Sequence, residues 1–379
     1  MYLKRAIFDK FLHKLAPNKV LILLGARRTG KTVFISQIIE KLNDPCLLLN
    51  GEDITTIDIL RNRSIENYKK LLHNKKVLII DEAQKVPEIG NILKLIVDEI
   101  KGIKIIATGS STFDLSNKLG EPLTGRKVSF HLYPFAQMEF APLENLIQTK
   151  DRLEDRMIFG NYPELEHYIT REEKTEYLKE IVSSYLLKDI LVFEGIRNSS
   201  KLFDLLRLVA FQIGKEVSYN ELGNKLQMSK NTIERYLDLL SKVFIIYKLQ
   251  GFSRNMRNEV TKTCKWYFYD NGIRNTLIAN HNPLNLRNDV GELWENYLFS
   301  ERIKYHDYTG MLVNKYFWRT YQQQEIDWIE ERGGRLYAYE LKWNPAKKVK
   351  PPSAWNEAYP GAGFEVLNRE NYLSWISPL

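Results

Sequence analysis

The stretch GARRTGKT, residues 25–32, constrains this 379-residue chain more than any other segment. It matches G-x-x-x-x-G-K-[ST] at every fixed position, after an apolar run at 20–24 and before a helical pattern. Glycines let backbone N–H groups converge on phosphate oxygens, and the following helix adds the positive end of its dipole. We therefore predict an α/β sheet that presents a phosphate-binding loop, formed by Gly25, Ala26, Arg27, Arg28, Thr29, Gly30, Lys31, Thr32 and Val33.

Side chains within the loop receive separate roles. We expect Lys31 to reach the β- and γ-phosphates and Thr32 to supply a hydroxyl ligand to Mg²⁺. Two interpretations stay open for Arg27 and Arg28, which either touch phosphate or face solvent.

Two further strand ends carry the polar groups that nucleotide hydrolysis needs. KKVLIIDEAQKVP, residues 75–87, has four apolar residues followed by Asp81 and Glu82, and IKIIATGSS leads to Ser110. Ligands of open α/β sheets bind at the carboxyl ends of strands. We predict that Asp81 holds Mg²⁺ through water, that Glu82 orients the attacking water, and that Ser110 either senses the γ-phosphate or only serves the turn.

Arg126 follows a glycine in the segment EPLTGRKVSF. An arginine finger neutralises charge in the transition state of phosphoryl transfer. Arg126 is therefore a candidate finger, in cis or toward a neighbouring chain, and a solvated arginine is the alternative.

The ordered set GARRTGKT, IIDEAQKVP, ATGSS, LTGR, LYPFAQMEF and GNYPEL resembles a prokaryotic group of AAA-type ATPases that carry a C-terminal DUF4143 region. The resemblance covers essentially the whole chain. It implies ATP as the nucleotide and a cytoplasmic location, but it supplies no physiological substrate.

Helical periodicity over 150–210 predicts a small helical lid. Residues 216–250 then predict a helix-turn-helix, with Ser218 and Glu221 forming a capping box and Ser229 capping the second helix. The strand-like runs that follow complete a winged helix. Candidate DNA contacts are Lys230, Asn231 and Arg235 on the second helix, and Arg254 and Arg257 in the wing. A packing or oligomer module is the alternative.

Four charged residues stand in order in the C-terminal third. Glu295 lies in a helical segment, Asp327 in one strand-like run, and Glu340-x-Lys342 in the next, where a period of two puts both side chains on one face. This order resembles the PD-(D/E)xK nuclease superfamily. We expect Asp327 and Glu340 to hold Mg²⁺ or Mn²⁺, Lys342 to orient water or stabilise charge, and Glu295 to tune the metal. A structural cluster of ion pairs is the alternative.

The net charge of +8 is compatible with DNA as a partner. Two cysteines without a CxxC pair indicate a reducing compartment, and we expect no signal peptide or membrane span. We predict an ATPase core at 1–140, a helical lid at 141–210, a winged helix at 211–265 and a nuclease-like, restriction-endonuclease-like α/β domain at 266–379. Three functions stay open: a DNA-directed ATPase that cuts, an ATP switch with an inactive nuclease fold, and a scaffold that forms homo-oligomers on ATP.

Overall fold

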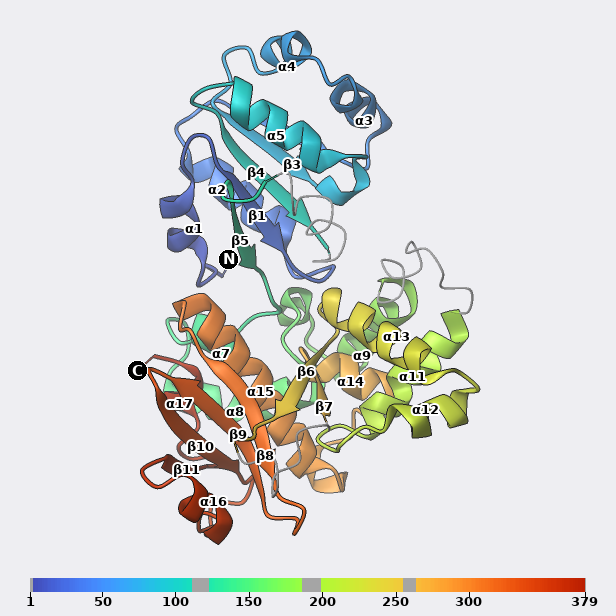
Figure 1. Cartoon of the computed structure of the whole chain (residues 1–379), viewed down its shortest axis with the longest axis vertical. Coiled ribbons are helices and arrows are strands. Elements are labelled where there is room, and N and C mark those ends of the chain that lie inside the picture. Colours follow the sequence, from blue (N-terminus) through green and yellow to red (C-terminus); the bar gives the residue numbers. More distant parts are fainter. Residues whose placement is uncertain (1–2, 111–122, 186–198, 255–263, 379) are drawn as a thin grey trace. The chain divides into compact units, whose positions relative to one another are not determined.

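The computed structural model describes residues 3–110, 123–185, 199–254 and 264–378 of the chain (Figure 1). It divides into two compact units. The first contains residues 1–133 together with 242–244, and the second contains 134–241 together with 245–379. Each unit is built around its own sheet.

The first unit has a five-stranded sheet in the order β2-β3-β4-β1-β5, with every neighbouring pair parallel. All five residues of β1 are buried, as expected for a parallel strand covered on both faces. The predicted α/β fold with a parallel sheet is therefore confirmed. The strands are β1 (Val20–Leu24), β2 (Cys46–Asn50), β3 (Val77–Asp81), β4 (Lys104–Gly109) and β5 (Lys127–His131).

Short helices flank this sheet (Figure 1). α5 shows why they form, because its buried Ile92, Leu93 and Ile96 follow the spacing of one helical face. The helices are α1 (Phe8–Lys14), α2 (Lys31–Lys41), α3 (Ile54–Arg61), α4 (Ile65–Leu71), the 3₁₀ turn η1 (Ala83–Lys85) and α5 (Ile89–Glu99).

The second unit contains a six-stranded mixed sheet in the order β11-β10-β9-β8-β6-β7. β8, β9 and β10 form an antiparallel meander, and β11 and β6 add in parallel to its two edges. The strands are β6 (Ile246–Gly251), β7 (Cys264–Phe268), β8 (Asn314–Arg319), β9 (Glu325–Arg332), β10 (Arg335–Leu341) and β11 (Gly363–Leu367).

Helices of the second unit pack on this sheet and on one another. The longest, α15 (Val290–Thr309), is buried along most of its length. No described helix has the length and apolar character needed to cross a bilayer. The others are α7 (Gln137–Phe140), α8 (Leu146–Phe159), η2 (Pro163–His167), α9 (Arg171–Glu180), η3 (Ile181–Tyr185), α11 (Ser199–Phe211), α12 (Tyr219–Leu226), α13 (Lys230–Lys242), α14 (Asn271–Leu277), η4 (Leu284–Leu286), α16 (Ser353–Ala358) and α17 (Leu373–Ile376).

The predicted domain boundaries differ from this division. The segment 141–210, expected as a lid of the ATPase, lies in the second unit, which begins at Pro134. The expected wing, β6 and β7, shares a sheet with β8–β11, because Gln250 and Gly251 of β6 pair with Tyr316 and Phe317 of β8. A boundary at 265/266 would therefore divide one continuous sheet.

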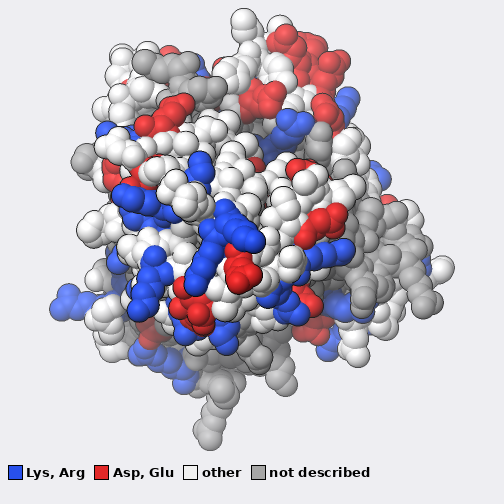
Figure 2. Space-filling model, turned by 90° about the horizontal axis from the view of Figure 1, so that it is seen from above, with Lys and Arg blue, Asp and Glu red and all other residues white. Residues whose placement is uncertain are grey.

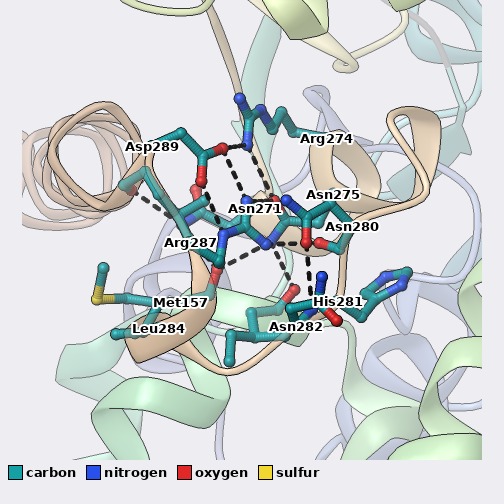
Figure 3. Close-up of polar contacts among 12 residues, drawn as sticks. Met157, Asn271, Arg274, Asn275, Asn280, His281, Asn282, Leu284, Arg287 and Asp289 are labelled. Carbon is teal, nitrogen blue, oxygen red and sulfur yellow. Dashed lines mark hydrogen bonds and ion pairs between the residues drawn. The ribbon is translucent and has the colours of Figure 1, made fainter.

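A buried polar network stabilises the junction between α14 and the start of α15 (Figure 3). The amide of Asn275 donates to the carbonyl of Ile158 over 2.7 Å, and its oxygen accepts from Arg287 over 2.9 Å. Arg287 also donates to both carboxylate oxygens of Asp289 at 2.8 Å, and Arg274 donates to the same carboxylate. Residues distant in sequence are thereby joined around one carboxylate.

Asp289 makes this network sensitive to acid. Burial raises the pKa of Asp289, but hydrogen bonds from Arg287 and Arg274 outweigh burial and lower the pKa to about 2. Because the folded pKa lies below the unfolded value, the carboxylate stabilises the fold above about pH 4, and this contribution is lost as the pH falls through about 2.

We predict that Asp289→Asn lowers the free energy of unfolding of the second unit by about 2–5 kcal/mol at pH 7, since two buried arginines lose their counter-charge. The difference from wild type should shrink as the pH falls from 5 to 3, where roughly half of the aspartate's own contribution of about 2 kcal/mol has gone. Urea unfolding across this pH range measures it. A difference that stays constant from pH 5 to 3 would contradict the assignment.

Candidate functional site

The predicted phosphate-binding loop lies at the carboxyl end of β1. Gly25 is required there, because a Cβ at this position would lie 2.2 Å from the Leu132 carbonyl oxygen. Lys31 is buried, and its ammonium donates to the carbonyls of Gly25 over 2.9 Å and Ala26 over 3.1 Å. α2 begins at Lys31 after Gly30, whose φ is 90°. The loop is therefore closed by its own lysine and presents a helix N-terminus.

Two hydroxyls and one carboxylate join the loop to the neighbouring strand ends. Thr32 Oγ1 donates to Asp81 Oδ2 over 3.0 Å, and the Thr108 hydroxyl donates to Asp81 Oδ1. Two cis ligands of an octahedral Mg²⁺, each about 2.1 Å from the ion, lie about 3 Å apart. This spacing would also suit Thr32 and Asp81 as two direct Mg²⁺ ligands, whereas the sequence predicts that Asp81 holds the ion through water. The Thr108 hydroxyl, for which no role was predicted, orients the Asp81 carboxylate.

Glu82, Gln84 and Ser110 form a second polar group beside Asp81. Glu82 has a left-handed backbone with φ 50°, and its N–H donates to the Thr108 hydroxyl over 3.1 Å. The amide of Gln84 donates to Glu82 Oε2 over 2.5 Å and to the Ser110 hydroxyl over 3.2 Å. The structure thus brings the predicted Glu82 and Ser110 together through Gln84, a residue that sequence reasoning missed.

Arg126 lies at the amino end of β5, whereas the loop follows the carboxyl end of β1, and this position argues against a finger acting in cis. It precedes β5, whose Lys127 pairs with Val20 at the start of β1, whereas the loop follows Leu24. Those two ends are about 13 Å apart along the strand. The Arg126 guanidinium lies 3.1 Å from an Asp98 carboxylate oxygen. The direction of β5 therefore leaves only a neighbour's site or a structural role.

Other loop positions differ in exposure. Arg28 is exposed with φ 65°, Arg27 is half-buried, and Val33 is exposed. These positions leave both interpretations of the arginines open.

In the second unit, the four predicted acidic-site residues converge. β9 and β10 pair antiparallel through Trp328 and Tyr339, one position from Asp327 and Glu340. The Lys342 ammonium lies 2.6 Å from Glu340 Oε1 and 3.7 Å from Asp327 Oδ2. Asp327 Oδ2 also accepts from the backbone N–H of Leu341 over 2.8 Å.

Glu295 and two residues of β7 complete this acidic cluster. The Tyr267 hydroxyl donates to Glu295, and the buried Lys265 ammonium donates to Glu325. Sequence reasoning missed Lys265, Tyr267 and Glu325, since no local pattern indicates that β7 joins this sheet.

Burial and like charges shift the proton affinities in the cluster. Burial raises the pKa of Glu295 to about 8; Lys265 opposes this rise and Asp327 adds to it. Burial and the Asp327 carboxylate raise the pKa of Glu340, against the effect of Lys342. Burial lowers the pKa of Lys265, but Glu295, Glu325 and Asp327 outweigh it, so the net shift is upward. Two protein cations therefore hold four carboxyl groups together.

Asp327 and Glu340 are the groups here that would hold a divalent cation, because carboxylate oxygens are the ligands that Mg²⁺ prefers. Lys342 already provides a cation between Asp327 and Glu340. Across the described residues, however, no three or more His, Cys, Asp or Glu side chains are grouped so that they could hold a metal ion.

Helices α12 and α13 form the expected pair with a tight turn between them. Ser218 caps α12 by accepting from the N–H of Glu221 over 3.3 Å, but the Glu221 carboxylate bonds Lys225, so the capping box is incomplete. Ser229 accepts from the N–H of Thr232 over 3.1 Å. Gln227 in the turn has φ 51°.

The predicted DNA contacts differ in their surroundings. Lys230, Asn231 and Arg235 are exposed on α13. Arg254 lies 2.5 Å from a carboxylate oxygen of Glu331, and Arg257 lies outside the described residues. On the face of the molecule shown in Figure 2, basic and acidic side chains are interspersed. The net charge of +8 is therefore not concentrated in one basic patch on that face.

We predict that Lys265→Met lowers the free energy of unfolding of the second unit by about 3–5 kcal/mol, because it leaves buried carboxylates without their cation. Lys342→Met is the matched control, since its ammonium serves the same cluster but is more exposed. Urea unfolding at pH 7 should show a smaller loss for Lys342→Met. Equal losses would contradict the central place of Lys265.

Three family models match successive parts of the chain. An AAA domain matches residues 17–141, a domain of unknown function (DUF8612) matches 150–285, and a domain of unknown function (DUF4143) matches 290–375. The DUF8612 and DUF4143 matches meet inside the second unit. There, β6 and β7 from the DUF8612 match belong to the same sheet as β8–β11 from the DUF4143 match.

Two proteins that are similar over most of the chain bear names that state no function. The uncharacterized protein MJ1544 of Methanocaldococcus jannaschii is 29% identical over 94% of this chain and 82% of its own length. An uncharacterized protein of Haemophilus influenzae is 26% identical over 83% of this chain and 80% of its own length.

A solved structure shares the fold. The Walker-type ATPase PABY2304 of Pyrococcus abyssi aligns with a TM-score of 0.50 and 16% identity, covering 73% of this chain and 96% of its own. Together, the family models and this fold support an AAA-type ATPase domain joined to a C-terminal DUF4143 region.

Proposed function

We propose that the chain binds ATP with Mg²⁺ at residues 25–33 and hydrolyses it. The observation that carries this proposal is the 3.0 Å contact between Thr32 Oγ1, in the first turn of α2, and Asp81 Oδ2, at the carboxyl end of β3, a separation that two neighbouring Mg²⁺ ligands would have. When bound, Mg²⁺ neutralises charge on the phosphates. The AAA domain match and the Walker-type fold support ATP as the nucleotide.

The residues of the chain have distinct parts in this proposal. The Lys31 ammonium donates to the carbonyls of Gly25 and Ala26, and when ATP binds it donates to phosphate oxygens instead. Glu82 orients the attacking water, and Gln84 holds the Glu82 carboxylate beside Ser110. Water orientation lowers the barrier without demanding tighter binding of ATP.

We predict that Lys31→Ala abolishes ATP binding, whereas Glu82→Gln binds ATP with near wild-type affinity and hydrolyses it about 100-fold or more slowly. Titration with a fluorescent ATP analogue and a phosphate-release assay separate the two effects. If Glu82→Gln hydrolyses ATP at the wild-type rate, Glu82 does not orient the attacking water. If the wild-type protein binds no ATP, the proposed function is wrong.

Arg126 is a candidate finger only toward a neighbouring chain, which requires the proposed homo-oligomer on ATP. Mixing Arg126→Ala chains with Lys31→Ala chains tests this. Activity above the sum of the two variants supports a trans finger, and no recovery in a purified mixed oligomer leaves Arg126 as the partner of Asp98.

We also propose that the chain acts on DNA through the acidic cluster of the second unit. Support comes from the convergence of Glu295 on α15, Asp327 on β9, Glu340 on β10 and Lys342 just after β10. In this proposal Asp327 and Glu340 hold Mg²⁺ or Mn²⁺, which supplies charge compensation and an activated water. Glu295, whose pKa is raised by burial, tunes the site, and Lys342 orients water or stabilises charge on the phosphate.

DNA binding in this proposal uses the exposed Lys230, Asn231 and Arg235 of α13, with Arg254 and Arg257 as wing contacts. Lysines and arginines that neutralise phosphates release counterions, so affinity should fall steeply with salt. Arg254 must exchange Glu331 for phosphate, which makes it the weaker candidate. A cytoplasmic location stays a prediction.

We predict that Asp327→Ala and Glu340→Ala remove metal-dependent DNA cleavage and leave ATP hydrolysis unchanged, because the two sites lie in different units. Lys342→Ala should slow cleavage while keeping salt-sensitive DNA binding. Single- and double-stranded DNA are incubated with Mg²⁺ or Mn²⁺, with ATP, ADP or neither. A wild-type protein that binds DNA and cuts under none of these conditions would favour the ATP-switched platform, and one that binds no DNA at low salt would favour the scaffold.

A further inference from the structure

Arg5 is a buried cation that contacts the phosphate-binding loop from outside the matched AAA domain, which begins at residue 17. Its Nη1 donates to the carbonyl of Thr29 over 2.9 Å, and its Nη2 donates to the carbonyl of Tyr133 over 2.6 Å. The two carbonyls are 104 residues apart in the chain, so one guanidinium fork joins two segments of the same unit.

The Thr29 carbonyl belongs to the peptide group that precedes Gly30. In a trans peptide, the carbonyl and the following N–H point in opposite directions. Holding the Thr29 oxygen toward Arg5 therefore turns the Gly30 N–H away from Arg5. A cation on the oxygen also polarises the peptide, which makes that N–H a stronger donor to an anion.

The second acceptor of Arg5, the Tyr133 carbonyl, belongs to the segment that packs against the phosphate-binding loop at Gly25. The N–H of Leu132 donates to the carbonyl of Leu24 over 2.7 Å, and the Leu132 oxygen lies against Gly25. Arg5 thus fixes the loop at Thr29 relative to the segment that already supports it at Gly25. An ammonium group lacks the planar fork that reaches both carbonyls.

We propose that Arg5 is a positioning residue for nucleotide binding, which sets the orientation of the 29–30 peptide and adds a buried positive charge to the phosphate site. This inference rests on the proposed binding of ATP at the loop. Arg5 acts through the Thr29 peptide rather than on the reacting atoms. A merely structural arginine would affect unfolding alone, whereas a positioning residue also affects the affinity of the folded protein for nucleotide.

Three variants of the full chain test the proposal: Arg5→Ala, Arg5→Lys and the control Lys4→Ala. Lys4 is the adjacent cation, and its exposed ammonium pairs with Asp9 over 2.6 Å. The dissociation constant of Mg·ATP, kcat and KM are measured well below the unfolding midpoint of each variant. We expect Arg5→Ala and Arg5→Lys to raise the dissociation constant and KM about 10- to 100-fold, the range for a lost charge-assisted hydrogen bond, and Lys4→Ala to match wild type.

Each outcome decides the matter. Arg5 variants with wild-type dissociation constants and a lowered unfolding midpoint would overturn the proposal in favour of a structural arginine. If Arg5→Ala does not fold, Arg5→Lys, which keeps the charge and loses the fork, decides alone. A wild-type chain that binds no ATP would overturn the proposed function itself, whereas failure of this inference requires a wild type that binds ATP and Arg5 variants that behave like Lys4→Ala.

Discussion

One buried carboxylate, Glu301 on α15, explains why the second unit begins where it does. Glu301 accepts from the N–H of Gln137 over 2.6 Å, from the amide of Asn161 over 3.1 Å and from Lys304 over 2.7 Å. Lys304 also donates to the carbonyl of Phe135. A charge taken out of water needs partners that replace its hydration. The segments LYPFAQMEF and GNYPEL supply them, so the end of the predicted ATPase core and part of the region expected to be a lid pack against α15.

Both candidate sites hold their charged groups in protein contacts that a ligand can take over. At the loop, Lys31 bonds two carbonyls and Thr32 bonds Asp81. In the acidic cluster, Lys342 lies between two carboxylates. Such pairing offsets the repulsion and desolvation of like charges gathered in one place. Under the proposed function, each site is formed before its ligand arrives, and binding would exchange one set of polar contacts for another.

The features that could be predicted from the sequence are those that short runs of residues determine. The loop, the apolar strands that precede Asp81 and Ser110, and the caps at Ser218 and Ser229 all follow from short patterns. Contacts between distant residues did not: Lys265 meets Glu325 from 60 positions away, and Arg5 meets Tyr133 from 128. The pairing of β6 with β8 depends on tertiary packing, so the predicted winged helix was separated from its sheet. The motif around Arg126 left a finger in cis, a finger toward a neighbouring chain and a solvated arginine open, because strand direction, which decides the end of the sheet at which Arg126 lies, is absent from the motif.

The most direct test of the account is an anomalous difference map from crystals grown with Mn²⁺ and a non-hydrolysable ATP analogue. Mn²⁺ accepts the same oxygen ligands as Mg²⁺ and reports its position directly. The account predicts one peak between Thr32 and Asp81, beside the analogue's phosphates, and a second between Asp327 and Glu340. A map with nucleotide bound elsewhere, or with no peak at Thr32 and Asp81, would contradict the account.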